Sequence, residues 1–409
     1  RAQLYAHVRS HWESKSTPWI TQLCGKSGMG KTTLARSYLE AFNGEYFSLR
    51  NLDAAFAPRI FLSGCKLWKD FFAEIGETKN RPVIFFDDVD DKKDFINALP
   101  ALAGKAYVVL LVRNLMELPF PFDVIQMTAM TMPMLLAENR ALEPLDALRT
   151  IAITDGIPEL VRLFDFQKSF AENLSPLFAH DSAYFCYAES ELRRNFRTPE
   201  TYNILLYGMA TGYNRISQLS EFSGFPQNKC DKYLKALDKA GLLETEQKKD
   251  AAGHIRTHYY PKGGYWKTWF RYVFPSQGRY LEVQKEEALQ QLVDEMDKTI
   301  VVEYFKKVCW NWLEKNYHSC YWDGFLKFDD PKQRDVMVNG VRFDYVQETK
   351  DHTIYVKIWD NVREGFPKEA FQKIEAATTA VRPFYENIYF LFSAGRACNY
   401  VEEVRNLET

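Results

Sequence analysis

The sequence is poor in cysteine and has no long apolar run. Seven cysteines are scattered through 409 residues, and no two of them form a C-x-x-C pair. This set excludes a disulfide framework and the usual zinc-ligand spacings, and it is typical of a reducing cytoplasm. No apolar run approaches the roughly 20 residues that span a bilayer, so we expect no membrane partner. The sequence therefore predicts a cytoplasmic protein.

Net charge is also nearly absent. The formal charge at pH 7 is −2, which favours no class of partner. The charge is unevenly distributed, however. Residues 191–280 hold 15 Lys and Arg against eight Asp and Glu, whereas residues 281–409 hold 17 against 23. A basic block inside a neutral chain is a candidate footprint for nucleic acid, although many such blocks are only solvated surfaces.

Apolar material is abundant enough for more than one core. Hydrophobic residues make up 46% of the chain and aromatic residues 15%, which argues against disorder. A chain of 409 residues exceeds one typical domain and predicts two or three.

The segment CGKSGMGKTT at residues 24–33 has the spacing of a phosphate-binding loop. It fits G-x-x-x-x-G-K-[ST], in which the glycines let backbone N–H groups face phosphate oxygens. We expect Lys31 to reach the β- and γ-phosphates of ATP and Thr32 to hold Mg²⁺. An apolar strand at 19–24 precedes the loop and a helical pattern follows it. The predicted nucleotide-binding residues of the loop are Gly25, Gly28, Gly30, Lys31, Thr32 and Thr33.

A continuous apolar run at 82–88, PVIFFDD, ends in two acidic residues. Such a run is typical of a central parallel strand buried on both faces. Asp87 is expected to complete the Mg²⁺ shell as a Walker B carboxylate. Asp88 stands where the water-activating acid is generally a glutamate. Because aspartate is one methylene shorter, we expect hydrolysis to be slow or to depend on a partner.

Two further strands complete the predicted sheet. YVVLLV at 107–112 ends in Arg113 and Asn114, and DVIQM at 123–127 adds a short strand. Asn114 is the first candidate for a polar sensor of the γ-phosphate, and Arg113 is the second. Strands that alternate with helices predict an α/β fold, a doubly wound parallel sheet with its ligand at the carboxyl ends of the strands.

These elements, in this order, resemble the archaeal-type ATPase family, P-loop proteins related to STAND and AAA+ ATPases. The resemblance rests on GKSGMGKT at 25–32, LWKDFFAEI at 67–75, FFDD at 85–88 and DGIPEL at 155–160. The last segment stands in place of the G-G-I-P segment in the family's small helical lid. The resemblance implies that the backbone around Gly156 and Pro158 lies near the nucleotide and couples its state to the lid. A turn glycine before a helix-starting proline would explain the same residues.

Residues 198–246 predict three helices followed by a β-wing, which is the pattern of a winged helix. The third helix carries Cys230, Tyr233, Leu234 and Leu237 on one apolar face. Such a module can place its third helix in the major groove of DNA, but it also serves as a protein–protein or regulatory element. Without a cluster for base readout, binding would rest on phosphates and depend on salt. The candidate DNA contacts are Lys229, Lys232, Lys235, Lys239, Lys248 and Lys249.

In the same family the final domain resembles restriction endonucleases, with an acid on one strand and E-x-K on the next. Here VRFDYVQ at 341–347 and TIYVKIW at 353–359 predict two strands that carry Asp344 and Lys357. Tyr355 occupies the place of the second acid, which removes one carboxylate from a site that needs two for Mg²⁺. The literal E-x-K at 348–350 lies in the predicted turn, and Asp335 is the remaining candidate ligand. We therefore expect an inactive, degenerate nuclease site.

The sequence thus predicts five regions. They are a P-loop ATPase core at 1–130, a helical lid at 131–195, a winged helix at 196–262, an aromatic and helical connector at 263–300, and a restriction-endonuclease-like domain at 301–409. The leading hypothesis is a slow, regulatory ATPase that binds ATP and Mg²⁺ and positions a winged helix on double-stranded DNA or on a DNA-bound complex. The alternatives are a STAND-like ATP/ADP switch that controls homo-oligomerisation or docking of a protein partner, and an ATP-dependent DNA nuclease.

Overall fold

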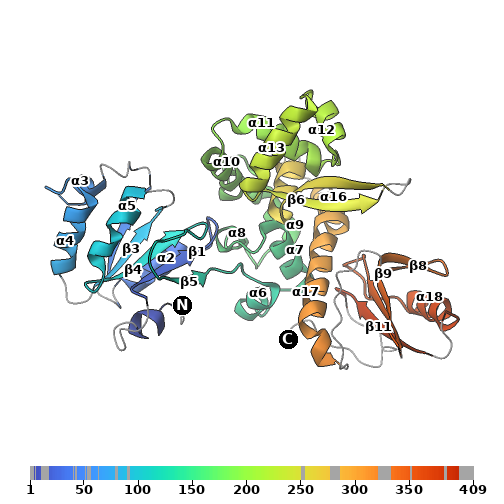
Figure 1. Ribbon diagram of the computed structural model, residues 1–409. Coiled ribbons are helices and arrows are strands. Elements are labelled where there is room, and N and C mark those ends of the chain that lie inside the picture. Colours follow the sequence, from blue (N-terminus) through green and yellow to red (C-terminus); the bar gives the residue numbers. More distant parts are fainter. Residues whose placement is uncertain are drawn as a thin grey trace. The chain divides into compact units, whose positions relative to one another are not determined.

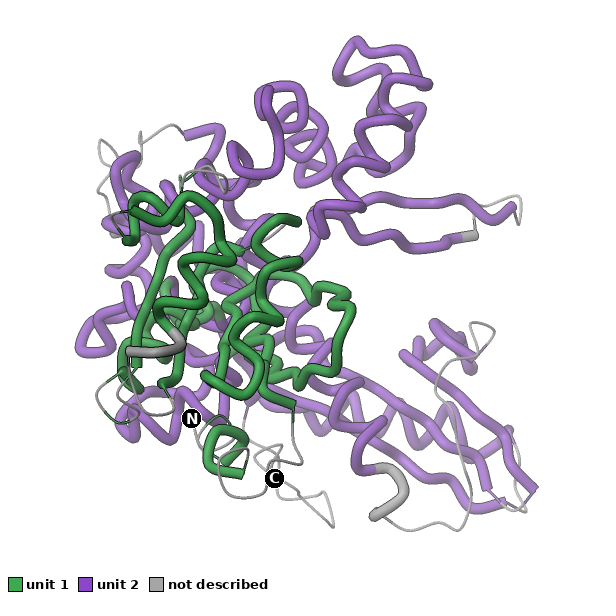
Figure 2. Tube along the Cα trace, turned by 60° about the vertical axis from the view of Figure 1, so that its left-hand side comes forward, with its two compact units in different colours: residues 1–129, 157–159 green, residues 130–156, 160–409 purple. Residues whose placement is uncertain are grey.

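The computed structural model describes most of the chain. The described residues are 4, 6–10, 18–39, 41, 44–50, 52, 57–62, 64–78, 82–89, 93–249, 254–276, 286–320, 333–350, 352–381 and 385–395. They divide into two compact units, Arg1–Ala129 with Ile157–Glu159, and Met130–Gly156 with Leu160–Thr409 (Figure 2).

A parallel sheet forms the frame of the first unit. Within the described residues its five strands have the order β2-β3-β4-β1-β5, and every neighbouring pair is parallel (Figure 1). The strands are β1 (Ile20–Cys24), β2 (Glu45–Ser48), β3 (Val83–Asp87), β4 (Tyr107–Val112) and β5 (Asp123–Gln126). The predicted parallel α/β sheet is thereby confirmed, and β4 lies between the strand that leads into the glycine loop and the strand that ends in Asp87.

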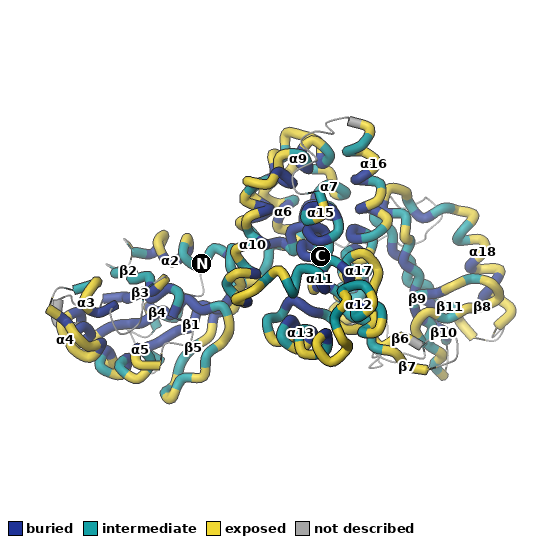
Figure 3. The backbone as a smooth tube through the Cα atoms, turned by 90° about the horizontal axis from the view of Figure 1, so that it is seen from above, coloured by how far each residue is buried: buried dark blue, intermediate teal, exposed yellow. Residues whose placement is uncertain are grey.

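Helices cover this sheet on both faces, as a doubly wound fold requires. They are α2 (Lys31–Tyr38), α3 (Ala57–Phe61), α4 (Trp68–Thr78), α5 (Lys93–Ala98) and the 3₁₀ turn η1 (Leu99–Leu102). All residues of β1, β3 and β4 are buried, which is why these strands are continuous apolar runs (Figure 3).

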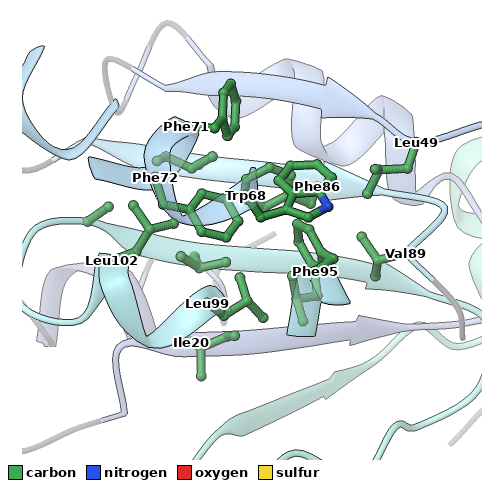
Figure 4. Packing of buried hydrophobic residues seen from close by; sticks show 14 of the residues in the cluster. Ile20, Leu49, Trp68, Phe71, Phe72, Phe86, Val89, Phe95, Leu99 and Leu102 are labelled. Carbon is green, nitrogen blue, oxygen red and sulfur yellow. The ribbon is translucent and has the colours of Figure 1, made fainter. Parts of the chain in front are cut away.

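The two faces of the sheet have different cores. One face packs on α4 and α5 through aromatic rings, with ring centroids 4.8 Å apart for Trp68 and Phe95 and 4.9 Å apart for Phe86 and Phe95 (Figure 4). Phe85 and its neighbours on the opposite face pack on Leu34 of α2. Alternation of side chains along β3 therefore separates an aromatic core from the core under α2.

The second unit begins in the region predicted as a lid. Its helices are α6 (Met132–Glu138), α7 (Pro144–Thr154), α8 (Pro158–Val161), α9 (Phe170–Leu177) and α10 (Ala183–Asn195), although the first residues of α8 belong to the first unit. Helix α7 ends where Asp155 (φ 51°) and Gly156 (φ 64°) enter the left-handed region. This conformation suits glycine and is tolerated by aspartate, and it stops the helix.

Three helices and a hairpin follow, and together we call residues 199–261 the helix–hairpin module. Its elements are α11 (Pro199–Ala210), α12 (Ile216–Ser223), α13 (Gln227–Lys239), β6 (Leu243–Lys249) and β7 (Ile255–Pro261). The two strands pair antiparallel. Cys230, Leu234 and Leu237 are buried on the predicted apolar face of α13. Asn214 fixes the hairpin to the α11–α12 turn, because its side-chain amide donates to the carbonyl of Tyr259 at 2.9 Å.

A helical connector and a second sheet complete the described chain. The connector comprises α14 (Gly264–Thr268), the π-helical turn η2 (Trp269–Val273), α15 (Phe274–Ser276), α16 (Glu286–Met296), the π-helical turn η4 (Asp297–Val301) and α17 (Val302–Cys320). The sheet contains β8 (Arg334–Val338), β9 (Val341–Glu348), β10 (His352–Ile358) and β11 (Glu386–Phe392), with α18 (Lys368–Thr379) between the last two strands. Its order is β11-β10-β9-β8, and β11 runs parallel to β10. Among the helices of the described ranges, none has the length and apolar character to cross a membrane.

Candidate functional site

The glycine loop joins β1 to α2 at the carboxyl edge of the first sheet. Gly28 (φ 76°) and Gly30 (φ 84°) both adopt the left-handed conformation that favours glycine. Gly30 is the N-cap of α2, so Lys31, Thr32 and Thr33 form its first turn. The first N–H groups of a helix have no acceptor within it, and helix N-termini therefore bind anions.

Lys31 closes this loop. Its ammonium group donates hydrogen bonds to the carbonyl oxygen of Gly25 and, at 2.9 Å, to that of Lys26. Gly25 is itself held by a hydrogen bond from its N–H to the carbonyl of Val112 at the end of β4, at 3.1 Å. The lysine that is predicted to bind phosphate thus lies against the backbone of the loop that is predicted to cradle it.

A carboxylate from β3 meets the first turn of α2. The hydroxyl of Thr32 donates to Oδ2 of Asp87 at 2.6 Å, and Asp87 is 8% exposed. Hydroxyl and carboxylate oxygens are the hard ligands that Mg²⁺ prefers. No cluster of three or more His, Cys, Asp and Glu side chains able to hold a metal occurs in the described part of the chain. A magnesium ion here would take its other ligands from water and phosphate, as this ion usually does, so the residues present fit Mg²⁺.

Tyr46 is a member of this group that the sequence analysis did not find. Its hydroxyl donates to the same oxygen of Asp87, also at 2.6 Å. Burial, and secondarily the hydrogen bond to Asp87, raise the pKa of Tyr46 to about 12. The phenol is therefore a donor at neutral pH. Tyr46 lies in a strand of only four residues, and the pairing of β2 with β3 was the information needed to place it.

Asp88 and Asn114 follow two neighbouring strands of the sheet. Asp88 adopts φ 57°, and its N–H donates to Oδ1 of Asp87 at 2.9 Å. Asn114 is exposed two residues beyond the end of β4. The loop that carries Arg113 and Asn114 is anchored by the buried amide of Gln22, which bonds the N–H of Met116 at 2.9 Å and its carbonyl at 2.7 Å. Both candidates therefore follow strands that lie next to each other, at the edge of the sheet that carries the glycine loop.

The segment Ile157–Glu159 packs on the glycine loop within the first unit. The N–H of Glu159 donates to the carbonyl of Gly28 at 3.1 Å. A Cβ added to Gly28 would lie 2.8 Å from Cγ2 of Ile157. Pro158, at the first position of α8, is therefore in the segment that contacts the loop. Gly156 belongs to the second unit, where its carbonyl accepts a hydrogen bond from the N–H of Met130 at 2.7 Å.

The candidate DNA-binding lysines with described side chains are all exposed, and three of them interact within the module. Lys229 lies 3.9 Å from the ring centroid of Phe225, and Lys235 forms an ion pair with Asp231 at 2.7 Å. Lys248 bonds Glu246 and the hydroxyl of Tyr260, each at 2.9 Å. Lys232 and Lys239 are exposed on α13. The side chain of Lys249 lies outside the described residues.

In the second sheet, Asp344 has structural partners. Its carboxylate accepts a hydrogen bond from the N–H of Ile358 at 2.8 Å and lies 3.9 Å from the ammonium of Lys306. Burial raises the pKa of Asp344, although that hydrogen bond and the charges of Lys306 and Lys357 oppose the rise. Tyr355 is buried, with its ring centroid 5.6 Å from that of Tyr389.

Neither alternative acid joins Asp344 as a metal ligand. Asp335 forms an exposed ion pair with Arg342 at 2.7 Å. Glu348 is the last residue of β9, at the hairpin turn where the literal E-x-K was predicted. The described residues of this sheet thus hold no acidic cluster around Asp344.

The first unit matches a known family. Residues 21–94 match the family model described as ATPase family associated with various cellular activities (AAA). None of the curated proteins compared with the chain matches it. The chain therefore contains an AAA ATPase domain, and ATP hydrolysis is the reaction of such a domain.

Several solved structures are similar to this chain. A Walker-type ATPase of Pyrococcus abyssi is 16% identical over 65% of this chain and 94% of that chain, with a TM-score of 0.42. The ORC1 protein of Aeropyrum pernix in complex with DNA is 13% identical over 70% and 92%, with a TM-score of 0.37. A STAND protein of Pyrococcus horikoshii with a tetratricopeptide repeat sensor is 16% identical over 76% and 53%, with a TM-score of 0.31.

Proposed function

We propose that this protein is a slow ATPase whose bound nucleotide sets the position of the helix–hairpin module, and that this module is a winged helix that binds the backbone of double-stranded DNA. In this proposal Lys31 neutralises the β- and γ-phosphates, while Thr32 and Asp87 hold Mg²⁺. Asp88 activates the attacking water, and Asn114, with Arg113 as second candidate, senses the γ-phosphate. The magnesium ion would supply charge neutralisation when it is bound.

Slow hydrolysis follows from the acid at position 88. An aspartate side chain reaches one methylene less far than a glutamate side chain. A general base must come within hydrogen-bonding reach of the water it activates, so a shorter acid lowers the rate. A slow ATPase spends most of its time in one nucleotide state or the other, which suits a conformational switch better than a motor.

The positioning role rests on one observation: the segment that contacts the glycine loop continues directly into a residue that bonds the chain just after the hairpin. Glu159 and Ile157 contact Gly28, and the next residues towards the N-terminus are Gly156 and Asp155. The Asp155 carboxylate accepts a hydrogen bond from the N–H of Gly264 at 2.7 Å. The segment 155–159 therefore connects the phosphate loop to the first residues after the hairpin.

Asp155 and its helix leave little room for the two glycines that follow the hairpin. A Cβ on Gly263 would lie 2.3 Å from Oδ2 of Asp155, and one on Gly264 would lie 1.8 Å from the carbonyl oxygen of Ala152. Both distances are far below an ordinary contact, so only glycine fits. Because Gly263 follows the end of β7 by two residues, a shift at Asp155 has to move the base of the hairpin.

The DNA role is supported by the surface of α13 and by the hairpin. All five of the candidate lysines with described side chains are exposed, but Lys229, Lys235 and Lys248 also interact within the module, and no such interaction is found for Lys232 and Lys239 among the described residues. We therefore propose Lys232 and Lys239 as the principal phosphate contacts on α13. A nuclease role is not proposed, because Asp344 is engaged with Ile358 and Lys306 and belongs to no cluster of three or more metal-binding side chains among the described residues.

The proposal is tested by measuring affinity for a DNA duplex across a salt series, with a non-hydrolysable ATP analogue and with ADP. We expect tighter binding in one nucleotide state, and no nucleotide dependence in Lys31→Ala, which should not bind ATP. Replacing Lys232 and Lys239 with Ala should reduce the dependence of log affinity on log salt by about 1.8, or about 0.9 for each phosphate contact. Lys235→Ala, whose partner is Asp231, is the matched control with a smaller effect.

The outcomes separate the hypotheses. Equal DNA affinity in both nucleotide states would overturn the positioning role. If no duplex binds even at low salt, the DNA part is wrong. A change of mass between ATP and ADP in light scattering would then support the STAND-like switch, in which nucleotide controls assembly or docking of a protein partner.

A further inference from the structure

The Walker B carboxylate is held by more donors than the predicted site contains. Oδ2 of Asp87 accepts hydrogen bonds from the hydroxyls of Thr32 and Tyr46, both at 2.6 Å. Oδ1 accepts from the N–H of Asp88 at 2.9 Å. A carboxylate has about four acceptor sites, so these three donors leave about one site for a metal-bound water.

Tyr46 lies in β2, and β3, which carries Asp87, lies between β2 and β4. Tyr46 is the second residue of β2 and pairs in register with Phe85, two residues before Asp87. Its ring packs on the core under α2, and the guanidinium carbon of Arg36 lies 5.6 Å from the ring centroid. Since Arg36 is one turn beyond Thr32 on α2, the ring lies between that helix and β3.

The hydroxyl groups of Thr32 and Tyr46 both donate to Asp87, but they have different roles in the site. Thr32 has one proton, which it donates to Asp87, and its two lone pairs stay available for a metal ion. Tyr46 also donates its one proton to Asp87, but nothing in its position requires it to touch the metal. Its bond therefore fixes the rotation of the carboxylate, and the carboxylate in turn orients the hydroxyl of Thr32.

We propose that Tyr46 is a positioning residue of the magnesium site, which holds Asp87 in the rotation that aligns Thr32 with Mg²⁺. This inference rests on the proposed nucleotide site and adds a residue that acts on the metal through Asp87. Groups that orient metal ligands typically contribute 10- to 100-fold to metal affinity. The effect of Tyr46 should therefore appear in the concentration of Mg²⁺ that the site requires.

The test is Tyr46→Phe in the full chain, which removes the hydroxyl and keeps the ring. Binding of a fluorescent ATP analogue is measured at fixed nucleotide while MgCl₂ is titrated. We expect the Mg²⁺ concentration at half-maximal binding to rise about tenfold, the lower end of that range, with binding at saturating Mg²⁺ unchanged. This readout does not depend on hydrolysis.

Tyr107→Phe is the matched control. Tyr107 lies in the same core, and its hydroxyl pairs with that of the buried Thr21 rather than with Asp87. It should leave the Mg²⁺ requirement unchanged. Thermal unfolding of both variants in EDTA reports any loss of folding that is independent of the metal.

A second comparison separates positioning from packing. If Tyr46 acts through Asp87, then Tyr46→Phe should have no further effect on the Mg²⁺ requirement in an Asp87→Asn background. A wild-type Mg²⁺ requirement in Tyr46→Phe, or an equal tenfold change in both backgrounds, overturns the proposal and leaves the ATPase function standing. Failure of the wild-type chain to bind the nucleotide at any Mg²⁺ concentration would instead overturn the proposed function, and the positioning role with it.

Discussion

The hydroxyl of Thr32 donates a 2.6 Å hydrogen bond to Asp87, which lies 55 residues later in the chain. This bond joins the first turn of α2, the helix that follows β1, to the end of β3, and in the sheet β4 lies between β1 and β3. The sheet thereby brings the predicted phosphate-binding loop and the carboxylate predicted to bind Mg²⁺ to one edge. Each was predicted separately from the sequence.

Replacing Asp87 with Asn tests the role of its charge. The amide oxygen can still accept the bond from Thr32, but the charge that attracts Mg²⁺ is lost. We expect ATP hydrolysis at saturating ATP to fall on the order of 100-fold, while ATP still binds at a high concentration of MgCl₂. The control is Asp94→Asn, on the exposed side of α5. Hydrolysis at the wild-type rate in Asp87→Asn would remove this carboxylate from the site.

A comparison of Gly28 with Gly104 separates the effect of backbone strain from the effect of side-chain contact. Their φ values are 76° and 75°, but a Cβ on Gly28 would meet Ile157 and Glu159 at 2.8 Å, whereas one on Gly104 would have nothing within 4 Å. Both alanine variants should lose about 1 kcal/mol of unfolding free energy, because the left-handed conformation disfavours a side chain.

Only Gly28→Ala should also weaken ATP binding. If displacing Ile157–Glu159 from the loop costs about 1.4 kcal/mol of binding free energy, the affinity for ATP falls about tenfold. The measurements are urea denaturation for stability and isothermal titration for ATP. Equal ATP affinities in the two variants would mean that the contact between the loop and this segment has no part in binding.

Asp297 and Asp335 form ion pairs of the same length in opposite surroundings. Asp297 is 4% exposed and accepts from Nε and Nη2 of Arg149, the latter at 2.7 Å, and from Arg363 as well. Asp335 binds Arg342 at 2.7 Å, but the side chains of both residues are 65% exposed. Asp297→Asn removes the buried carboxylate that the two arginines share. Because Arg149 keeps Asp146 and Arg363 keeps Asp294, the cost should be about 3 kcal/mol of unfolding free energy, the lower end of the range for breaking a buried pair.

Asp335→Asn should cost less than about 1 kcal/mol, because water screens an exposed pair. Asparagine also tolerates the left-handed backbone of Asp335 (φ 54°), so the substitution adds little strain. Urea denaturation followed by circular dichroism compares the two. Similar losses in both variants would show that burial does not decide the strength of these pairs.

Much of the fold was predictable from local pattern. The strands at 20–24, 83–87 and 107–112 are continuous apolar runs, and the buried face of α13 repeats at helical spacing. Both signals depend only on neighbours along the chain. The phosphate loop was predictable for the same reason, since its residues are contiguous.

The missed residues act through pairs that lie far apart in the sequence. Tyr46 meets Asp87 across 41 residues, Arg363 meets Asp297 across 66, and Asp155 meets Gly264 across 109. Each pair depends on strand register or helix packing, and neither can be inferred from spacing. A charged residue in a helical pattern, such as Asp297, also predicts a solvated position. Asp297 is instead buried, because two arginines from other elements bind its carboxylate.

The last prediction concerns the pH dependence at Asp344. Burial raises its pKa above the ordinary value of 3.8, so folding favours the neutral acid. The stability that this preference contributes is complete below pH 3.8 and is lost as pH rises through the higher pKa of the folded state. At pH 7 the ionised carboxylate therefore costs stability.

Asp344→Asn should remove that cost, because the amide oxygen still accepts the bond from the N–H of Ile358. We expect this variant to be more stable than the wild type at pH 7 in urea denaturation. The difference should shrink to nothing as the pH approaches 3.8. Lys306→Met, which removes a cation 3.9 Å from the carboxylate, should steepen the loss of stability with rising pH. A loss of stability in Asp344→Asn at pH 7 would mean that this site needs its negative charge, which is what a working metal site would require and a degenerate one would not.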